Sequence, residues 1–552
     1  MEKKNNQRLL ALSFVLSTML IIMTACGTMN PVVNEETQPA QTTSLAEETL
    51  PEQEATMVLK NGAIYTMDAN NTVASAIAVL NDQIIYVGDD AGVEKYIGNG
   101  TQVIDLAGEM VSPGFIDGHT HEVGNLIKKD TSVYLNETKP DLELYKEALK
   151  RFIEEHPTEE VIYGTGMDLN AFPDSIPTNG WIDEIVTDKP VIFSDMSGHG
   201  NLINSKALEM AGITSETTAP AGGTIYKDAN GELTGYLSDS GSLLEVFPII
   251  EYTPQMYREA FLKFQKEMNS YGITGIAIAG PTIDPSQAWA VFNEMEKNGE
   301  LSLRINCVTW TFGDSAFGKE LAETAIKVLD EGQKYNSDFQ HVSMVKGIID
   351  GVPEGKTAFL LEPYAPGAEM DADYRGPQFA TQDEMNEFVA TIDKAGYQVQ
   401  IHAMGDAGVN TTLNAFEYAQ TQNGVRDSRH AIAHVTLITD ADKVRMGKLK
   451  VIGAMQPLWW YYDPFFSPLE EQMFGTERFD SEYHIKDMVD AGIVITGSID
   501  YPVLLDARPL NGIEAGATQS SPYPGEEDDP TYVRNADQAV SVLEMLKIYT
   551  TN

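Results

Sequence analysis

The pattern of apolar and polar residues changes character along the chain. From Met57, short alternating runs of apolar residues predict strands, and Asn61-Gly62 is a pair typical of hairpin turns. This pattern predicts a small β domain over residues 57–110. The following stretch, residues 125–265, mixes amphipathic helical patterns with a few strand-like runs.

A regular alternation begins after residue 265. Apolar, strand-like runs are separated by amphipathic helical patterns, which predicts parallel strands with helices packed outside them. The runs are Gly272–Ala279, Leu303–Trp310, Val342–Asp350, Tyr397–Met404, His430–Leu437, Val451–Leu458 and Gly492–Ile499. One further run, Val111–Ile116, leads directly into His119 and His121. Together they supply the eight strands of a (β/α)8 TIM barrel, which carries its chemistry at the C-terminal ends of the strands.

The predicted fold class is therefore α/β. We expect a barrel over residues 111–552, with residues 125–265 inserted after the first strand as an α/β subdomain. An insertion at this end of a barrel is expected to form part of a lid over the substrate.

Residues 1–25 predict an export signal, because a basic start precedes a nearly unbroken apolar stretch from Leu9 to Met23. Met23-Thr24-Ala25-Cys26-Gly27 resembles the lipobox of bacterial lipoproteins. That resemblance implies cleavage before Cys26 and a lipid on its sulfur, at the extracytoplasmic face of a bacterial cell membrane. A plain secretory signal is the alternative. Residues 26–56 are rich in Thr, Glu, Pro and Ala and predict a flexible tether.

The net charge of the chain limits the classes of partner that it can bind. There are 37 Lys and Arg residues against 82 Asp and Glu residues, so the formal net charge is −45. Nucleic acid is excluded as a partner, since binding phosphates requires clustered positive charge. A solubilising surface is the simplest interpretation, and a preference for cationic substrates is left open. Only two cysteines occur, far apart, which argues against a disulfide framework.

Candidate metal ligands lie at the ends of the predicted strands. Side chains two residues apart on a strand face the same way, so His119 and His121 would present two imidazoles to one metal. The ends of later strands add Lys346, His402, His434 and Asp500. Singly, each is explained as a hydrogen-bonded core residue or a helix cap. Six such residues at the same end of successive strands indicate a metal site.

This order of residues resembles the amidohydrolase superfamily and, more narrowly, amidohydrolase family 3, the N-substituted formamide deformylase-like hydrolases. The resemblance extends from about residue 57 to the end of the chain. It rests also on the motifs Pro113–His119, Asn204–Leu208, Gly222–Tyr226, Gly231–Gly235 and Gly497–Val503. The small β domain is a β-sandwich in such proteins.

The resemblance implies a ligand assignment. His119, His121 and Asp500 would hold a first, more buried divalent metal, and His402 with His434 would hold a second. Lys346 would bridge the two metals as an N-carboxylated lysine. Zinc suits a site of imidazoles and carboxylates. The alternative is a lysine that pairs with a carboxylate such as Asp350, which would leave one metal.

The implied reaction is hydrolysis of a non-peptide C–N bond, of amide or formamide type, in a small-molecule substrate. A metal-activated water would attack, and Asp500 would act as general base. His199, in the insertion, is a candidate catalytic residue that would contact the substrate or the oxyanion, with a structural role as the alternative.

Two other functions stay open from the sequence: a lipoprotein that binds a solute without turnover, and an inactive truncated homologue. Family members continue beyond the last barrel helix with strands that complete the β-sandwich, whereas this chain ends soon after the helical pattern at 538–548. The expectation is therefore an incomplete β-sandwich that exposes apolar edges. A homo-oligomer is also left open.

Overall fold

The structure is a computed structural model that describes residues 53–136, 138–172, 177–195, 200–220, 224–238, 240–248, 250–310, 317–526 and 529–552. The predicted signal peptide, Cys26, most of the predicted tether and His199 lie outside these residues. Among the described residues, no helix is long and apolar enough to cross a membrane. The chain divides into two compact units, one of Met1–His121, Gln265–Pro281 and Phe292–Asn552, the other of Glu122–Phe264 and Thr282–Val291.

The first part of unit 1 forms two small sheets. Their strands are β1 (Met57–Lys60), β2 (Ala63–Tyr65), β3 (Val73–Ala74), β4 (Ala76–Leu80), β5 (Gln83–Gly88), β6 (Gln102–Asp105) and β7 (Met110–Val111), in the orders β5-β4-β1-β6 and β3-β2-β7. Alternation puts Met57 and Leu59 in one apolar cluster and Val58 in another. Five large apolar side chains here are 41–51% exposed: Val73, Ile84, Val87, Val103 and Met110.

The rest of unit 1 is built on an eight-stranded parallel sheet. Its strands are β8 (Phe115–Thr120), β15 (Ile273–Ile278), β16 (Arg304–Trp310), β17 (Gln340–Ile348), β18 (Gln398–Ala403), β19 (Ala431–His434), β20 (Ile452–Met455) and β21 (Ile495–Gly497), hydrogen-bonded to their neighbours in chain order. β8 and β21, the two end strands of this sheet, also contact each other, so the barrel is nearly closed. A Cβ at Gly118 would lie 2.6 Å from Thr496 Cγ2, so glycine permits this approach. The predicted TIM barrel is confirmed.

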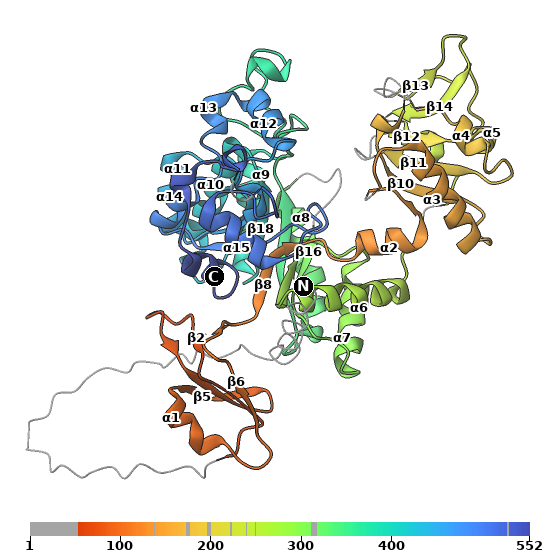
Figure 1. Cartoon of the computed structure of the whole chain (residues 1–552). Coiled ribbons are helices and arrows are strands. Elements are labelled where there is room, and N and C mark those ends of the chain that lie inside the picture. The colour runs from red at the N-terminus through yellow and green to blue at the C-terminus, as the bar shows by residue number, and fades with distance from the viewer. Residues whose placement is uncertain are drawn as a thin grey trace, which may run out of the picture. The chain divides into compact units, whose positions relative to one another are not determined.

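Helices follow the barrel strands (Figure 1). They are α7 (Pro285–Lys297), α8 (Lys319–Gly332), α9 (Gln382–Lys394), α10 (Asp406–Asn423), α11 (Asp440–Leu449), α12 (Phe466–Phe474), α13 (Thr476–Phe479), α14 (Ile485–Asp490), α15 (Pro509–Thr518) and α16 (Val542–Ile548). Helix α9 shows why they form: Thr381 and Glu384 make a capping box at its start, and Met385, Phe388 and Ile392 are buried at helical spacing.

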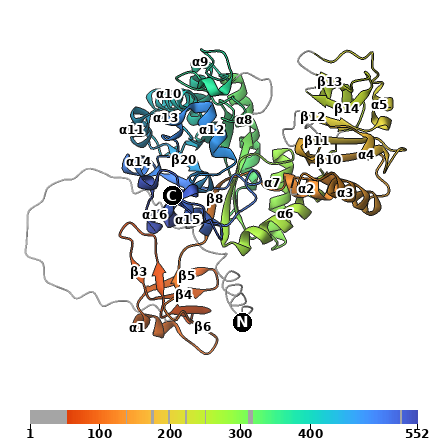
Figure 2. The ribbon, with the colours of Figure 1, turned by 45° about the horizontal axis from the view of Figure 1, so that its top comes forward.

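Unit 2 contains a six-stranded mixed sheet in the order β13-β14-β12-β11-β10-β9 (Figure 2). The strands are β9 (Val133–Tyr134), β10 (Ile162–Met167), β11 (Val191–Asp195), β12 (Gly200–Ile203), β13 (Thr224–Lys227) and β14 (Leu233–Ser238). The helices are α2 (Gly124–Thr131), α3 (Leu142–Glu155), α4 (Gly180–Asp183), α5 (Ser205–Ala211) and part of α6 (Pro254–Ser270). The segment Thr282–Val291 belongs to the same unit, although the sequence pattern did not associate it with the insertion.

Candidate metal centre

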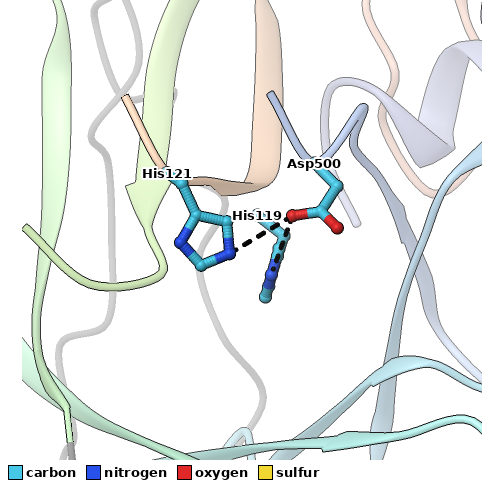
Figure 3. Close-up of side chains that lie close together, drawn as sticks. All are labelled: His119, His121 and Asp500. Atoms are coloured by element: carbon cyan, nitrogen blue, oxygen red, sulfur yellow. Dashed lines mark ion pairs between the residues drawn. The ribbon is translucent and has the colours of Figure 1, made fainter. Parts of the chain in front are cut away.

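Three side chains converge at the ends of β8 and β21. His119 lies on β8, His121 directly follows it, and Asp500 follows β21 (Figure 3). Oδ1 of Asp500 is 3.3 Å from Nε2 of His119 and 3.4 Å from Nε2 of His121. Ligand atoms of the three residues lie within 4.8 Å of one another, as a shared metal ion requires. We call these residues the first ligand group.

The backbone holds this group in place. The N–H of His121 donates to the carbonyl oxygen of Tyr501 at 2.7 Å, which fastens the loop after β21 to the end of β8. Asp500 has a φ of 55°, in the left-handed region that non-glycine residues seldom adopt. Such strain concentrates at functional sites, where the surrounding structure enforces it.

Hydrogen bonding fixes which nitrogen of His119 faces the group. Nδ1 of His119 is 2.8 Å from Oε1 of Gln400, while Nε2 of that amide donates to the carbonyl of Gly118 at 3.5 Å. Since an amide oxygen only accepts, Nδ1 carries the hydrogen and Nε2 presents its lone pair. Burial, followed by the nearby Lys346, lowers the pKa of His119 well below its usual value. Burial lowers the pKa of His121 to about 3, so both imidazoles are neutral, as metal ligands must be.

A cation fits between these atoms. Oδ1 of Asp500 is buried and accepts no hydrogen bond from the described residues. Oδ1 faces the Nε2 atoms of two neutral imidazoles. Nε2 of His119 carries a lone pair and cannot donate a hydrogen bond to it. Leaving a buried carboxylate oxygen unpaired costs about 1–3 kcal/mol, or more when the group is charged. A divalent ion bound by all three residues would remove this cost, and the mixed nitrogen and oxygen donors suit zinc.

A second ligand group consists of His402, at the end of β18, and His434, at the end of β19. Their ring centroids are 4.5 Å apart, and the ring of His434 is 5.1 Å from that of His119. Burial lowers the pKa of His402 to about 4 and that of His434 well below its usual value. His434 has a φ of 77°, a second left-handed residue at a strand end.

The hydrogen bonds of this group again select the ligand nitrogens. Nδ1 of His434 is 3.0 Å from Oε1 of Gln456, whose Nε2 donates to Ser498 Oγ at 2.7 Å. Nε2 of His434 therefore presents its lone pair. Nε2 of His402 is 3.2 Å from the carbonyl oxygen of Gly351, so Nε2 carries the hydrogen and donates it, and Nδ1 presents the lone pair that could bind a metal.

Lys346 lies between the two groups. The residue is 2% exposed on β17, and its Nζ is 3.1 Å from Nε2 of His119. Burial lowers the pKa of Lys346 to about 8, against the opposing effect of Asp500. Asp350, the alternative partner considered from sequence, accepts from the backbone N–H groups of Phe359, Met404 and Gly405 at 2.8–3.1 Å. Its oxygens anchor two loops.

Sequence reasoning missed Gln400 and Gln456. Gln400 precedes His402 by two residues on β18, so it shares a strand face with a predicted ligand. An unexplained polar residue within an apolar run was the available signal, and the same holds for Gln456 directly after β20. His199 lies outside the described residues, and its assigned role stays a prediction.

The two groups open into one cavity of about 370 Å³. Its lining includes His121, Lys346, His402, His434 and Asp500. The ring of Trp459 stacks on His434 with the centroids 5.5 Å apart and also lines the cavity. The structure thus brings five of the six predicted ligands to one cavity, and the sixth, His119, contacts Lys346 and Asp500 behind it.

Known proteins resemble this chain over most of its length. The model of the amidohydrolase family matches residues 102–552. Protein LONG AFTER FAR-RED 3 of Arabidopsis thaliana is 28% identical over 474 residues, covering 85% of this chain and 79% of that protein. N-substituted formamide deformylase of Arthrobacter pascens is 22% identical over 515 residues, covering 90% and 88%. The crystal structure of an uncharacterized metal-dependent hydrolase from Pyrococcus horikoshii shares the fold, with a TM-score of 0.67, 22% identity and coverage of 89% and 91%.

The family match, together with three residues that could hold a metal ion, supports a metal-dependent hydrolase. The chain belongs to the amidohydrolase family.

Proposed function

We propose that the protein hydrolyses a non-peptide C–N bond, of amide or formamide type, in a small molecule. The observation that carries this proposal is the buried Oδ1 of Asp500, which faces His119 and His121 without a hydrogen bond from any described residue. The similarity to an N-substituted formamide deformylase supports the choice of bond.

The ligand residues would hold zinc as follows. His119, His121 and Asp500 would bind the first ion, and His402 with His434 the second. Lys346 would bridge the ions after carboxylation; its pKa of about 8 makes the neutral amine, the form that reacts with carbon dioxide, accessible near neutral pH. Bound metal lowers the pKa of water toward neutrality and polarises the scissile carbonyl.

Side chains of the protein then transfer the proton and orient the ligand histidines. Asp500, as general base, takes a proton from the attacking water and delivers it to the leaving nitrogen, so that hydroxyl adds to the carbonyl carbon while the C–N bond breaks. Gln400 and Gln456 keep the rings of His119 and His434 in one tautomer. Trp459, stacked on His434, shields that imidazole from bulk water.

The experiment is a turnover assay on zinc-loaded protein with a panel of N-formyl and N-acyl amines, following amine release and zinc content together. Asp500→Asn is expected to lower kcat by about 10²–10⁴-fold, the usual contribution of a general base. Asp371→Asn, a change at an exposed carboxylate, is expected to leave kcat unchanged. Stoichiometric zinc with no turnover of any amide would overturn the proposal and favour a solute-binding role.

We also propose that Cys26 carries a lipid that anchors the protein at the outer face of a bacterial membrane. The support is the sequence around Cys26, with its basic start, apolar stretch and lipobox-like end. Metabolic labelling with a radioactive fatty acid tests this: label is expected on the wild type and absent from Cys26→Ser. Unlabelled wild-type protein released to the medium would contradict it.

A further inference from the structure

Besides the ligand residues, carboxylates and aromatic rings line the same cavity. Glu470 lies on α12 with its side chain 13% exposed, and Glu354 follows β17. The aromatic residues of the lining are Trp459, Tyr461, Phe466, Tyr483 and Tyr523. Among the described residues of the lining, Lys346 is the one lysine or arginine, and it lies with the metal ligands.

The buried charged side chains next to this lining carry more negative than positive charge. Glu482 is fully buried and interacts with Glu470 and Glu354. Nη2 of Arg534 donates to Oε2 of Glu482 at 2.6 Å, and Nη1 of Arg534 is 3.7 Å from Oε2 of Glu470. One guanidinium therefore lies within ion-pair distance of two of these three carboxylates. Oε1 of Glu482 is buried and accepts no hydrogen bond from them.

The pKa values of two of these carboxyl groups reflect the same excess of negative charge. Burial, together with repulsion from Glu482, raises the pKa of Glu470 well above its usual value. Burial raises the pKa of Glu482 to about 7, against the attraction of Arg534. A positive charge in the cavity would stabilise the ionised carboxylates, whereas a neutral group would leave them desolvated without a counter-charge.

A fourth carboxylate of the lining has another role. Asp463 accepts from the backbone N–H groups of Phe465 and Phe466, both at 2.8 Å, at the start of α12. Its negative charge is therefore committed to the helix N-terminus. Glu470 and Glu354 are the carboxylates of the wall that are placed to meet a ligand.

We propose that the substrate of this hydrolase carries a cationic alkylammonium group, which is held between Glu470, Glu354 and the aromatic wall. The inference rests on the proposed function of the same cavity and names its substrate class. Aromatic faces attract cations, and the attraction strengthens where water is excluded. The net charge of −45 further favours the approach of cations.

Ligands of equal shape and different charge test this inference by binding alone. Choline, its neutral isostere 3,3-dimethylbutan-1-ol and the anion 3,3-dimethylbutanoate would be titrated into the zinc-loaded full chain by calorimetry at physiological salt. Choline is expected to bind about tenfold or more tightly than the alcohol, as a desolvated cation–π contact alone supplies. The anion is expected to bind more weakly than both. Equal affinities, or preference for the anion, would overturn the inference.

Charge-neutralising variants locate the effect. Glu470→Gln is expected to reduce the ratio of choline to alcohol affinity severalfold, and Glu354→Gln, at an exposed position, to reduce it less. Glu477→Gln changes an exposed carboxylate on the neighbouring α13 and is expected to keep the wild-type ratio. If Glu470→Gln does not fold, Glu354→Gln carries the test. A ratio unchanged in both folded variants would contradict the assignment.

Turnover separates this inference from the proposed function. Formamides of 2-(trimethylammonio)ethylamine and of 3,3-dimethylbutylamine share the same shape, and kcat/KM is expected to be about tenfold higher for the cation. Hydrolysis of both at equal kcat/KM would overturn the inference while the proposed function stands. No hydrolysis of either, with choline still preferred in binding, would overturn the proposed function for formamides and leave the charge preference intact.

Discussion

The two ligand groups share one cavity but differ in how completely the protein assembles them. In the first group, the ligand atoms of His119, His121 and Asp500 already converge within 4.8 Å. The second group has two histidines, and the nearest carboxylate oxygen to His434 among the described residues is Oδ2 of Asp500, which belongs to the first group and is 4.0 Å from Nδ1. Asp350 is 3.7 Å from Nε2 of His402, but that nitrogen faces Gly351 and the carboxylate is held by backbone N–H groups.

From this difference we expect the two groups to bind metal under different conditions. The first group supplies an anionic ligand from the sequence itself. Under the proposed assignment, the second would depend on carboxylation of Lys346, because its amine cannot serve as an anionic ligand. The first site should therefore bind metal in any folded chain, and the second only where Lys346 has reacted.

Removing a ligand from the first group is expected to have the largest effect. His119→Ala should release the first metal and lower kcat/KM by about 10³-fold or more, since Lewis-acid stabilisation of the transition state is worth several kcal/mol. Zinc analysis beside the turnover assay measures both. His430→Ala is the control, because His430 is a buried histidine that pairs with Asp393 away from the ligands. Full zinc and full activity in His119→Ala would contradict the assignment.

Removing the bridge should affect only the second group. Lys346→Ala is expected to lower zinc from about two ions per chain to about one, and added propionate should restore the second by supplying a carboxylate in the vacated space. Lys443→Ala removes another buried lysine, paired with Asp440, and should not change the zinc content. Loss of both ions, or of neither, in Lys346→Ala would remove the distinction between the groups.

The two glutamines allow each group to be weakened separately. Gln400→Leu should reduce affinity at the first group and Gln456→Leu at the second, each by about 10–100-fold, because the amide fixes the tautomer of a ligand histidine. Competition with a zinc-binding dye measures the two affinities. The corresponding Gln→Glu variants, which still accept from Nδ1, should retain most of the affinity. Equal weakening of both sites by either leucine variant would contradict the separation.

The histidines should also make metal-free protein sensitive to acid. The pKa values of His121 and His402 fall to about 3 and 4 in the folded state, below about 6.5 in the unfolded chain. The unfolded state therefore binds protons first, so the stability is complete above about pH 6.5 and is lost as the pH falls. Between pH 6.5 and 5.5 the loss should be about 2 kcal/mol for the two residues together. Urea unfolding measures it, and a flat profile in metal-free protein would contradict the assignment.

The barrel could be predicted because its strands are apolar runs with sharp ends. The run Tyr397–Met404 became β18 with one residue less at each end. The start of α10 is less visible in the sequence, because the helix begins at Asp406, before the buried apolar positions Val409, Leu413 and Phe416. Its first turn buries Gly408 against the Asp350 carboxylate, and small residues in such contacts carry little hydrophobic signal.

The candidate ligands could be located from sequence because each stands at the end of a strand, where polar residues are conspicuous. The residues that orient them could not. Gln400 and Gln456 act through contacts with residues on other strands or in other loops, and such contacts exist only after the barrel has closed. The charge imbalance around Glu470 likewise depends on Arg534, 64 residues away in the chain, which no local pattern connects to it.

The most direct test of the central claim is anomalous diffraction at the zinc edge from crystals of the zinc-loaded protein. We expect a strong peak between Oδ1 of Asp500 and the Nε2 atoms of His119 and His121, with bonds of about 2.0–2.2 Å. A second peak is expected beside His402 and His434, with density for a carboxyl group on Nζ of Lys346. No peak at the first position, or zinc bound only at the Glu470 carboxylates, would contradict the account.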